Sequence, residues 1–453
     1  MKISSMYNLG KALLKSYFSS KNIFINQKVT KDIRNKALRK SVTTAYYETE
    51  FYRKLYDKHG VHPKDIQTVA DLPKLPIVTK RDLIDNFKEA IPKSLNIKNA
   101  FILGTSGSTG QPVQVYKDYA WVEQFISWNF RIFKNHKLKF TKTVCITDNA
   151  SSQSMESNTE SFAKLFSKKI AFVNVEQDIG KMMDKIEKEN PEHLTAYTGV
   201  MRELATLKKN GRGKDLKLRK LMVGGEMMDN YTRDYINEAF GCTCFNVYGS
   251  TEGGIIAFEC PHEKMHIMAD TVTIEIIDKD GNPVSNGEDG NILLTCHDGG
   301  KGTPIIRYNG CSDVSFLLKD NTCSCGMHTP ILGQIKGRSV DSIYLPNGKI
   351  YHAFSLTIPM EKIQRQHGKD QVRQYQIVQE DINTININIV RNKEKVQSED
   401  EFKDLLDIID KSYQEIFGKS VKLSLSEVEN IPKGNNPGAP TPLVLSKIGR
   451  KIA

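Results

Sequence analysis

Between about residues 100 and 340, short apolar runs alternate with longer stretches of helical periodicity. Two clear examples are residues 143–147 and 221–225, and each run has the length of one strand. A repeated order of strand and then helix is typical of an α/β domain in which helices cover a mostly parallel sheet. Two later runs, residues 271–277 and 291–295, alternate apolar and polar side chains. We expect them to add short antiparallel strands.

The pattern changes near residues 337–342. Beyond this point an alternating strand at 385–389 precedes apolar residues at helical spacing, and Gly418 stands where that helix would end. A chain of 453 residues also exceeds the size at which one hydrophobic core usually stops growing. We therefore expect a large α/β layered domain, a hinge, and a small mobile α+β domain. The predicted bounds are 1–340 for the large domain, with a mostly helical lead-in over 1–95, and 341–453 for the small domain.

Composition limits the classes of partner. Hydrophobic residues make up 39% and charged residues 26% of the chain, which is ordinary for a soluble protein with a sizeable core. The net charge of +11 raises the question of nucleic acid, but the lysines are scattered and no aromatic-interleaved basic stripe is present. We expect no nucleic-acid partner. The sequence has no run of about 18 apolar residues and no secretory signal pattern at its start, so we expect a cytoplasmic protein without a transmembrane segment.

A proline-containing segment, LPKLPIVTK at residues 72–80, closes the lead-in. Its two prolines favour extended backbone. Thr79 then stands in the position of an N-cap, because threonine oxygen can accept a hydrogen bond from the first turn of a helix. We expect that helix to run through Leu83.

A loop rich in glycine and hydroxyl residues, GTSGSTGQP at residues 104–112, lies between two strand-like runs. Its glycines allow several backbone N–H groups to converge on one anion, and four hydroxyls add further donors. This is the chemistry of a phosphate-binding loop. The loop is not of the Walker type, because Gln111 follows Gly110 where that motif has lysine. On these residues alone, a flexible linker explains the loop equally well.

A second motif, NVYGSTEGG at residues 246–254, combines an aromatic residue, two hydroxyls and a carboxylate. Tyr248 can stack on a base. Glu252 can hold Mg²⁺ that bridges phosphate groups, since Mg²⁺ prefers one or two carboxylates plus phosphate oxygens. Taken alone, the motif is also consistent with a glycine-rich turn and a capping glutamate.

Together these segments resemble the adenylate-forming superfamily of acyl- and aryl-coenzyme A ligases, peptide-synthetase adenylation domains and luciferases. The likeness is greatest to the branch of phenylacetate–coenzyme A ligases and capsule-locus proteins, and it spans nearly the whole chain. Its motifs occur in the family's order at residues 72–80, 104–112, 224–226, 248–252, 307–313 and 337–341.

The resemblance implies a reaction and its cofactors. A carboxylic acid would react with ATP and Mg²⁺ to form an acyl-adenylate and pyrophosphate, and coenzyme A would then accept the acyl group. A carrier-protein thiol, an amine or a sugar is the alternative acceptor. A non-catalytic nucleotide-binding relative also stays open, and so does a nucleic-acid-binding protein built on a zinc knuckle. The motif at 307–313 departs from the family, because Asp313 lies one residue farther from Arg307 than usual.

The resemblance also implies roles for individual residues. Thr251 would touch the α-phosphate, Glu252 would hold Mg²⁺, and Asp341 would be the hinge. The residues implied in ATP binding are Thr105, Ser106, Gly107, Ser108, Thr109 and Gly110 at the phosphates, Gly224, Gly225, Glu226, Tyr248 and Gly249 at the adenine, and Asp313 and Arg338 at the ribose. The catalytic lysine near the C-terminus has three candidates, and SKIGR fits the family pattern best. They are Lys447, which we favour, Lys433 and Lys451.

Seven of the eight cysteines lie between residues 242 and 325. Clustered cysteine and histidine in a reducing compartment suggest zinc rather than disulfides. The branch resemblance selects a Cys–x₅–His pair and a Cys–x–Cys pair as ligands of a structural Zn²⁺. The alternative is buried free cysteines. The selected ligands are Cys260, His266, Cys323 and Cys325, with His262 and Cys311 as spare candidates.

The carboxylic acid needs a pocket beside the phosphate-binding residues. We expect its pocket at Trp128, Tyr197, Thr198 and Gly199, next to Gly224. The two aromatic residues favour an aryl or short acyl acid, although core packing explains them equally well. A monomer and a homodimer both remain open.

Overall fold

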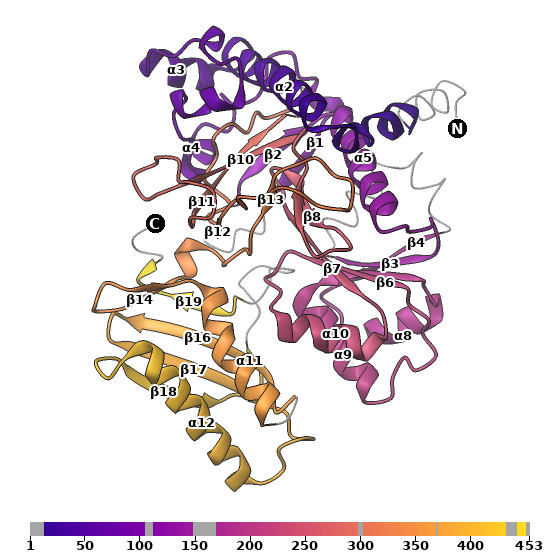
Figure 1. The fold of residues 1–453 in the computed structure, drawn as a ribbon, viewed down its shortest axis with the longest axis vertical. Helices are drawn as coiled ribbons and strands as arrows, with labels where there is room; N and C mark the ends of the chain where they lie inside the picture. Colours follow the sequence, from indigo (N-terminus) through magenta and orange to yellow (C-terminus); the bar gives the residue numbers. More distant parts are fainter. Residues whose placement is uncertain are drawn as a thin grey trace. The chain divides into compact units, whose positions relative to one another are not determined.

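A computed structural model of the chain describes residues 13–104, 112–147, 169–297, 302–367, 370–431 and 442–449 (Figure 1). It forms two compact units. The first comprises residues 1–226, 236–311 and 315–334, and the second comprises residues 227–235, 312–314 and 335–453. Most of the second unit is the continuous stretch from residue 335 to the end, and two short earlier segments also belong to it. The sequence suggested one boundary, at 340/341.

An eight-stranded sheet forms the centre of the first unit, and the predicted α/β fold class is confirmed (Figure 1). The strand order is β13-β9-β8-β7-β6-β5-β3-β4. Five strands are parallel to one another: β3 (Thr143–Thr147), β4 (Ile170–Asn174), β5 (His193–Tyr197), β6 (Lys220–Gly224) and β7 (Cys244–Ser250). Three continue the sheet in antiparallel fashion: β8 (Gly254–Glu259), β9 (Met265–Ile267) and β13 (Ile331–Leu332).

Helices follow the parallel strands and pack on the sheet. Asp178 caps α8 (Ile179–Glu189) by accepting hydrogen bonds from two backbone N–H groups of its first turn. This helix and α9 (Thr198–Lys209) bury apolar faces spaced three and four residues apart, as Met201, Leu204 and Ala205 do. Two further helices in the described part of this region are α5 (Tyr119–Asn135) and α10 (Asn230–Phe240).

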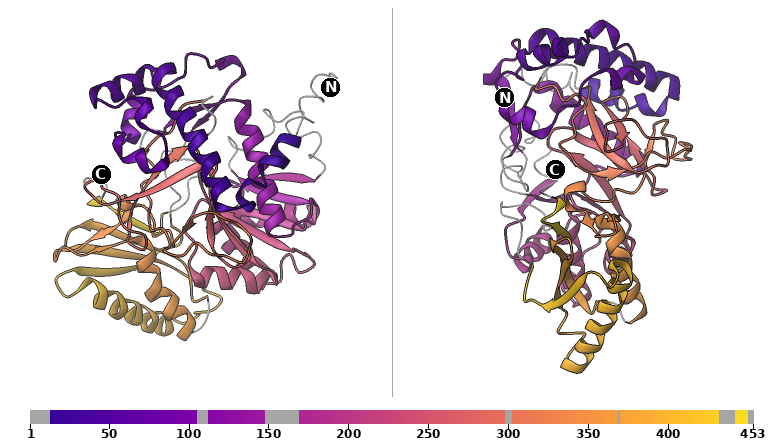
Figure 2. Two further views of the ribbon diagram at one scale, coloured as in Figure 1. Left: turned by 45° about the horizontal axis from the view of Figure 1, so that its top comes forward. Right: turned by 90° about the vertical axis from the view of Figure 1, so that its left-hand side faces the viewer.

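The lead-in consists mainly of helices, which are drawn in indigo and purple in Figure 2. Tyr52 donates a 2.8 Å hydrogen bond to the carbonyl of Pro304. Among the described residues, this region includes η1 (Asn22–Phe24), α2 (Gln27–Glu48), α3 (Glu50–Lys58), η2 (Pro63–Asp65), η3 (Val69–Lys74), α4 (Lys80–Asp85) and η4 (Ile97–Asn99).

The prediction of extended backbone over residues 72–80 is wrong for its first part. Pro73 lies inside the 3₁₀ helix η3, whose start is fixed by a capping box between Thr68 and Asp71. The chain is extended from Leu75. The predicted N-cap is confirmed, because the Thr79 side chain accepts a hydrogen bond from the backbone of Asp82 at the start of α4.

Two small sheets complete the first unit. β1 (Phe101–Gly104) and β2 (Gln114–Lys117) form an antiparallel pair around the glycine-rich loop, of which residues 105–111 lie outside the described part of the chain. β10 (Val272–Ile277) and β11 (Gly290–Cys296) are the predicted antiparallel strands, and β12 (Val314–Ser315) pairs beside β11.

The second unit has a four-stranded sheet in the order β18-β17-β16-β19. Isoleucines at 385, 387 and 389 bury one face of it, and α12 presents Phe402, Leu405 and Ile409 to the same core. Gly418 has a φ of 81° and ends that helix, as predicted. The elements are η5 (Ser339–Asp341), β14 (Ile343–Tyr344), β15 (Ile350–Tyr351), η6 (Ala353–Leu356), α11 (Thr357–Gln366), β16 (Val372–Asp381), β17 (Thr384–Arg391), α12 (Glu399–Phe417), β18 (Lys422–Glu427) and β19 (Val444–Ser446). Within the described residues, no helix is both long enough and apolar enough to span a bilayer.

Candidate functional site

The carboxyl ends of β5, β6 and β7 lie side by side at one edge of the main sheet. Tyr197 pairs with Gly224 across β5 and β6, and Gly224 pairs with Val247 across β6 and β7. Three segments that the sequence singled out separately, 197–199, 224–226 and 248–252, therefore meet at this edge. The carboxyl edge is where open α/β sheets bind their ligands.

Glu226 is joined to the start of α9. Its carboxylate accepts a 2.5 Å hydrogen bond from the backbone N–H of Gly199, and Thr198 donates a 3.4 Å hydrogen bond to its carbonyl. A carboxylate at the N-terminus of a helix is favoured by the helix dipole. This contact fixes the loop after β6 against the predicted substrate residues.

Close packing explains three glycines of this edge. A Cβ atom at Gly224 would lie 2.6 Å from the carbonyl oxygen of Val247, and one at Gly249 would lie 2.6 Å from that of Gly254. Gly225 has a φ of 76°, and a Cβ there would lie 2.8 Å from the Tyr197 ring. Only glycine fits such positions without shifting a neighbouring strand or ring.

Glu252 is buried in the turn between β7 and β8, one residue after Thr251, with 4% of its surface exposed. Tyr308, which is fully buried, donates a 2.9 Å hydrogen bond from its hydroxyl to Oε1 of Glu252. Burial and the adjacent Glu252 carboxylate hold the pKa of Tyr308 well above its usual range. The phenol is therefore neutral and a permanent donor. Sequence reasoning missed this contact, because 56 residues separate the two partners.

The ribose motif has an unusual backbone. Arg307 and Ser312 have φ angles of 46° and 54°, in the left-handed region, and they frame the segment that holds the additional residue. Within the second unit, Asp313 and Arg338 form an isolated antiparallel bridge, so the two predicted ribose residues are neighbours. Asp341, the predicted hinge residue, is buried in η5.

Trp128 is completely buried. Its indole N–H donates a 3.0 Å hydrogen bond to Oγ1 of Thr271. A Cβ atom at Gly254 would lie 2.4 Å from the Trp128 ring. The indole therefore packs against Gly254, which follows the turn that carries Glu252.

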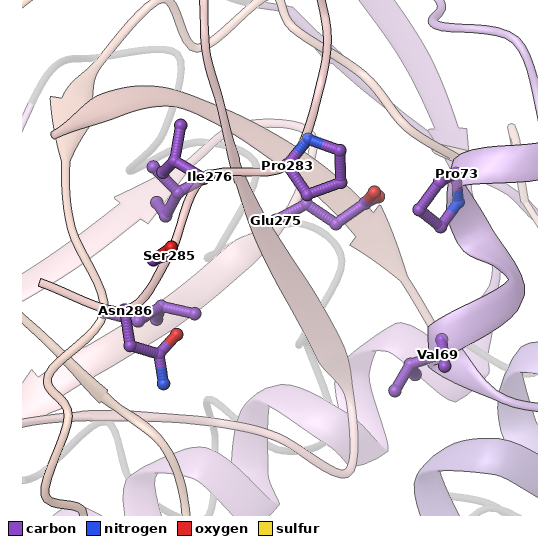
Figure 3. Close-up of a pocket in the computed structure, with 10 residues that line it drawn as sticks. Val69, Pro73, Glu275, Ile276, Pro283, Ser285 and Asn286 are labelled. Carbon is purple, nitrogen blue, oxygen red and sulfur yellow. The ribbon is translucent and has the colours of Figure 1, made fainter. Parts of the chain in front are cut away.

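A cavity of about 340 Å³ lies in another part of the first unit (Figure 3). Val69 and Pro73 of the lead-in form one wall, and Ile276 and Pro283 form another. The Glu275 side chain extends between them, and the carboxylate is directed toward Pro73 (Figure 3). The residues predicted to line the substrate pocket do not line this cavity.

Four side chains form a candidate metal centre. The ligand atoms of Cys260, His266, Cys323 and Cys325 all lie within 4.8 Å of one another. The sulfur atoms of Cys260 and Cys323 are 3.7 Å apart, and Cys325 Sγ is 3.3 Å from His266 Nε2. Tetrahedral zinc with bonds of roughly 2.0–2.3 Å needs ligand separations of about 3.3–3.8 Å, and both of these distances lie in that range.

The polar surroundings of this cluster favour metal binding. His266 Nδ1 lies 3.1 Å from Oγ1 of Thr329, which leaves Nε2 facing Cys325. The hydrogen bond with Cys325 lowers the pKa of the Cys260 thiol below its ordinary value. A thiolate is the form that binds zinc. Among the described residues, the spare candidates His262 and Cys311 are not part of the group.

Lys447 follows β19 in the second unit, and its ammonium contacts the carboxylate of Glu380. The preceding Ser446 is buried, donates to Gln379 and accepts from the backbone of Gly449. These contacts fix the local backbone, while the Lys447 side chain is 60% exposed. Lys433 and Lys451, like Thr105, Ser106, Gly107, Ser108, Thr109 and Gly110, lie outside the described residues.

Comparison with known proteins gives concordant results. The profile of a family described as AMP-binding enzyme matches residues 19–298, and that of the CapK C-terminal domain matches residues 343–438. Phenylacetate-coenzyme A ligase of Thermus thermophilus is 26% identical over 353 residues, which cover 72% of this chain and 75% of the relative. Protein CapK of Staphylococcus aureus is 25% identical over 278 residues, 57% of each chain. The crystal structure of 2-hydroxyisobutyryl-CoA ligase with 2-HIB-AMP matches with a TM-score of 0.79 at 16% identity, over 95% of this chain and 93% of that one, which shows a shared fold.

Proposed function

Given that this chain belongs to the family of AMP-binding enzymes, we propose that it activates a carboxylic acid with ATP and transfers the acyl group to coenzyme A. The observation that carries the proposal is the buried Glu252 carboxylate at the carboxyl edge of the parallel strands, beside Thr251 and held by Tyr308. The names of the similar proteins, phenylacetate-coenzyme A ligases, support the same chemistry.

In the first half-reaction, a carboxylate oxygen attacks the α-phosphorus of ATP, and the bond to pyrophosphate breaks. Residues 105–110 bind the leaving phosphates, and Thr251 contacts the α-phosphate. Glu252 would hold a Mg²⁺ ion, and this ion would neutralise phosphate charge. Positioning and electrostatics supply the catalysis, because the protein makes no covalent bond in this step.

In the second half-reaction, the coenzyme A thiolate attacks the acyl carbon, and AMP leaves with the electron pair of the acyl–phosphate bond. We propose that the small domain, 341–453, turns about Asp341 between the two steps and brings Lys447 to the α-phosphate for the first. Gly224, Gly225, Glu226, Tyr248 and Gly249 contact the adenine, and Asp313 and Arg338 bind the ribose. Tyr197, Thr198, Gly199 and the Trp128 region border the acid.

A second candidate concerns the acceptor, since residues 343–438 match the CapK C-terminal domain, whose description names no coenzyme A. In this version the acyl-adenylate forms in the same way, and an amine, a sugar hydroxyl or a carrier-protein thiol attacks it. The first half-reaction is common to both versions, so one assay tests them together and a second separates them.

The first assay is exchange of labelled pyrophosphate into ATP, with aryl and short acyl acids supplied one class at a time. Acid-dependent exchange is expected, and Glu252→Gln should lower its rate about 10²–10³-fold. The matched control is Glu415→Gln, which changes an exposed carboxylate on α12 and should leave the rate unchanged. Addition of coenzyme A should then yield a thioester. Wild-type enzyme that fails to exchange with any acid class would sink the proposal, and exchange without a thioester would favour the second acceptor.

We also propose that Cys260, His266, Cys323 and Cys325 bind one structural Zn²⁺. The donor set of three sulfurs and one nitrogen is one that closed structural zinc sites use. Zinc here would tie the turn between β8 and β9 to the loop that precedes β13. Metal analysis of purified protein should find about one zinc per chain. We also propose that the protein works in the cytoplasm, where thiols stay reduced and ATP and coenzyme A are available.

A further inference from the structure

The hydrogen bond between Tyr308 and Glu252 restricts a carboxylate that would otherwise rotate. The Tyr308 hydroxyl lies 2.9 Å from Oε1, and both side chains are buried from water. A neutral phenol can only donate a hydrogen bond to a carboxylate. The contact therefore holds Oε1 of Glu252 at the Tyr308 hydroxyl and limits rotation of the carboxylate. Hydrogen bonds to charged acceptors are stronger than those between neutral groups. The orientation of Glu252 therefore depends on where Tyr308 lies.

Backbone hydrogen bonds hold Tyr308 from two sides. Its N–H and C=O bond with Leu294 of β11 at 3.0 and 2.9 Å. On the other side, Val78 of the lead-in donates to the carbonyl of Arg307 at 2.9 Å and accepts from Asn309 at 3.0 Å. The strand-like position of Tyr308 thus requires residue 78, which lies 230 positions earlier in the chain.

The Arg307 side chain fixes the backbone next to Tyr308 through contacts with the lead-in and with Glu275. The Arg307 φ of 46° is strained for a residue with a side chain. The guanidinium donates from Nη1 to the carbonyl of Leu75 at 2.5 Å and to that of Pro73 at 3.4 Å, and Nε pairs with Glu275 at 3.2 Å. The side chains of Arg307 and Glu275 are only 4% and 11% exposed. The backbone carbonyls of Pro73 and Leu75, at the end of η3, therefore hold the Arg307 side chain in place.

The Tyr308 hydroxyl also needs glycine at position 310. A Cβ atom at Gly310 would lie 1.9 Å from the Tyr308 hydroxyl oxygen, so a side chain at that position would occupy the place of the phenol. The path from the lead-in to Glu252 is continuous: residues 73–78 bind Arg307 and its neighbours, these fix Tyr308, and Tyr308 orients the carboxylate.

We propose that Tyr308 is a positioning residue for the Mg²⁺-binding carboxylate of Glu252, and that residues 73–78 set its position through Arg307. The inference rests on the proposed function, because it assigns Glu252 to Mg²⁺·ATP. It gives the lead-in segment a role in nucleotide binding through contacts within the first unit.

The test is Tyr308→Phe, which removes one oxygen and keeps the ring. The half-saturating Mg²⁺ concentration in pyrophosphate exchange should rise about tenfold, the scale of one hydrogen bond to a charged group. Calorimetric binding of a non-reacting methylene analogue of ATP with Mg²⁺ should weaken by a similar factor. The matched control is Tyr52→Phe, which removes an equally buried hydroxyl that donates to a carbonyl at 2.8 Å. Its Mg²⁺ dependence should stay that of the wild type, and both variants should lose similar thermal stability.

A double variant separates action through Glu252 from a general structural effect. If Tyr308 acts through Glu252, Tyr308→Phe combined with Glu252→Gln should bind the analogue no more weakly than Glu252→Gln alone. Additive losses would overturn the proposal, as would a Tyr308→Phe enzyme with wild-type Mg²⁺ dependence. Wild-type protein that neither exchanges pyrophosphate nor binds the Mg²⁺ analogue would overturn the proposed function and this inference with it. An approximately tenfold weakening of Mg²⁺ dependence and of analogue binding in Tyr308→Phe but not in Tyr52→Phe, with a similar loss of thermal stability in both, supports the inference.

Discussion

Arg131 and Asp270 form a two-pronged ion pair that is closed to solvent. The Nη1–Oδ1 and Nη2–Oδ2 distances are 2.7 and 2.5 Å, and the two side chains are 0% and 3% exposed. Nη2 also donates to the carbonyl of Ser19 at 2.9 Å. The pair therefore joins α5 to the turn before β10 and to the start of the lead-in. Parallel N–H···O bonds of this kind are directional as well as strong.

Removal of one member of this pair should be costly. Arg131→Met keeps the length of the side chain but leaves the Asp270 carboxylate buried without its partner. We expect the free energy of unfolding to fall by about 3–5 kcal/mol. Urea unfolding followed by circular dichroism measures it. Arg131→Met combined with Asp270→Leu should recover part of the loss, because no charge is then left in the interior. A single variant that loses less than about 1 kcal/mol would show that the pair is solvated.

Gly254 should tolerate no side chain. It has a φ of 66°, and a Cβ there would lie 2.4 Å from the Trp128 ring. Gly241 is a matched control, because its φ is 65° and nothing lies within 4 Å of its added Cβ. Gly241→Ala should cost about 1–2 kcal/mol of backbone strain. Gly254→Ala should cost about 1–3 kcal/mol more, since the ring must move. If thermal unfolding shows the same loss of stability in Gly254→Ala and Gly241→Ala, the Trp128 ring moves aside without measurable cost.

His297 should make stability fall on acidification. Burial and the positive charge of Arg34 lower its pKa to about 3. The folded state therefore favours the neutral ring, and its contribution is complete above the unfolded pKa of about 6.5 and is lost as the pH falls toward the folded value. Between about pH 7.5 and about pH 5, this residue should remove up to about 2 kcal/mol.

The measurement compares wild type with His297→Gln by urea unfolding at both pH values. The variant should lack this increment, so its stability should change less with pH. His59→Gln, which alters an exposed histidine, is the control and should follow the wild type. An identical pH dependence in His297→Gln and wild type would contradict the prediction.

Removal of zinc should destabilise the first unit. A chelator such as TPEN should lower the melting temperature, and added Zn²⁺ should restore it, because a ligand of the native state stabilises that state. Cys323→Ser should reproduce the loss and should abolish the response to chelator. Cys242→Ser replaces a cysteine outside the cluster and should keep both the metal and the response. Unchanged metal content in Cys323→Ser would count against the assigned ligand set.

Lys447→Ala should separate the two half-reactions. Pyrophosphate exchange should fall about 10²–10³-fold, the scale for loss of one charged group at the transition state. Thioester formation from pre-formed acyl-adenylate should stay near the wild-type rate, since the lysine serves only the first step. Lys422→Ala, an exposed lysine of β18, is the control. Equal loss in both steps would show that Lys447 does not have this role.

Much of the fold was predictable because its signals are local. The strand at residues 143–147, the antiparallel pair of β10 and β11, the Thr79 cap and the glycine that ends α12 all occur as the sequence indicates. Each depends on side-chain periodicity or on the chemistry of a few adjacent residues. The family prediction is confirmed by the match over residues 19–298, because ordered motifs identify a family without any knowledge of contacts.

Other features needed the tertiary structure. The 3₁₀ helix through Pro73 arises because the capping box at residues 68–71 outweighs the local preference of the prolines, and its carbonyls then bind Arg307. The packing of Trp128 against Gly254 also needed the folded chain, because 126 residues separate the two. The sequence by itself determined most element types, which are encoded over short distances, and the order of the motifs. It also indicated the four side chains that form the candidate metal centre. Only the folded chain decided that Tyr308 meets Glu252 and that Arg131 meets Asp270, because such pairs depend on distances in space between residues far apart in the chain.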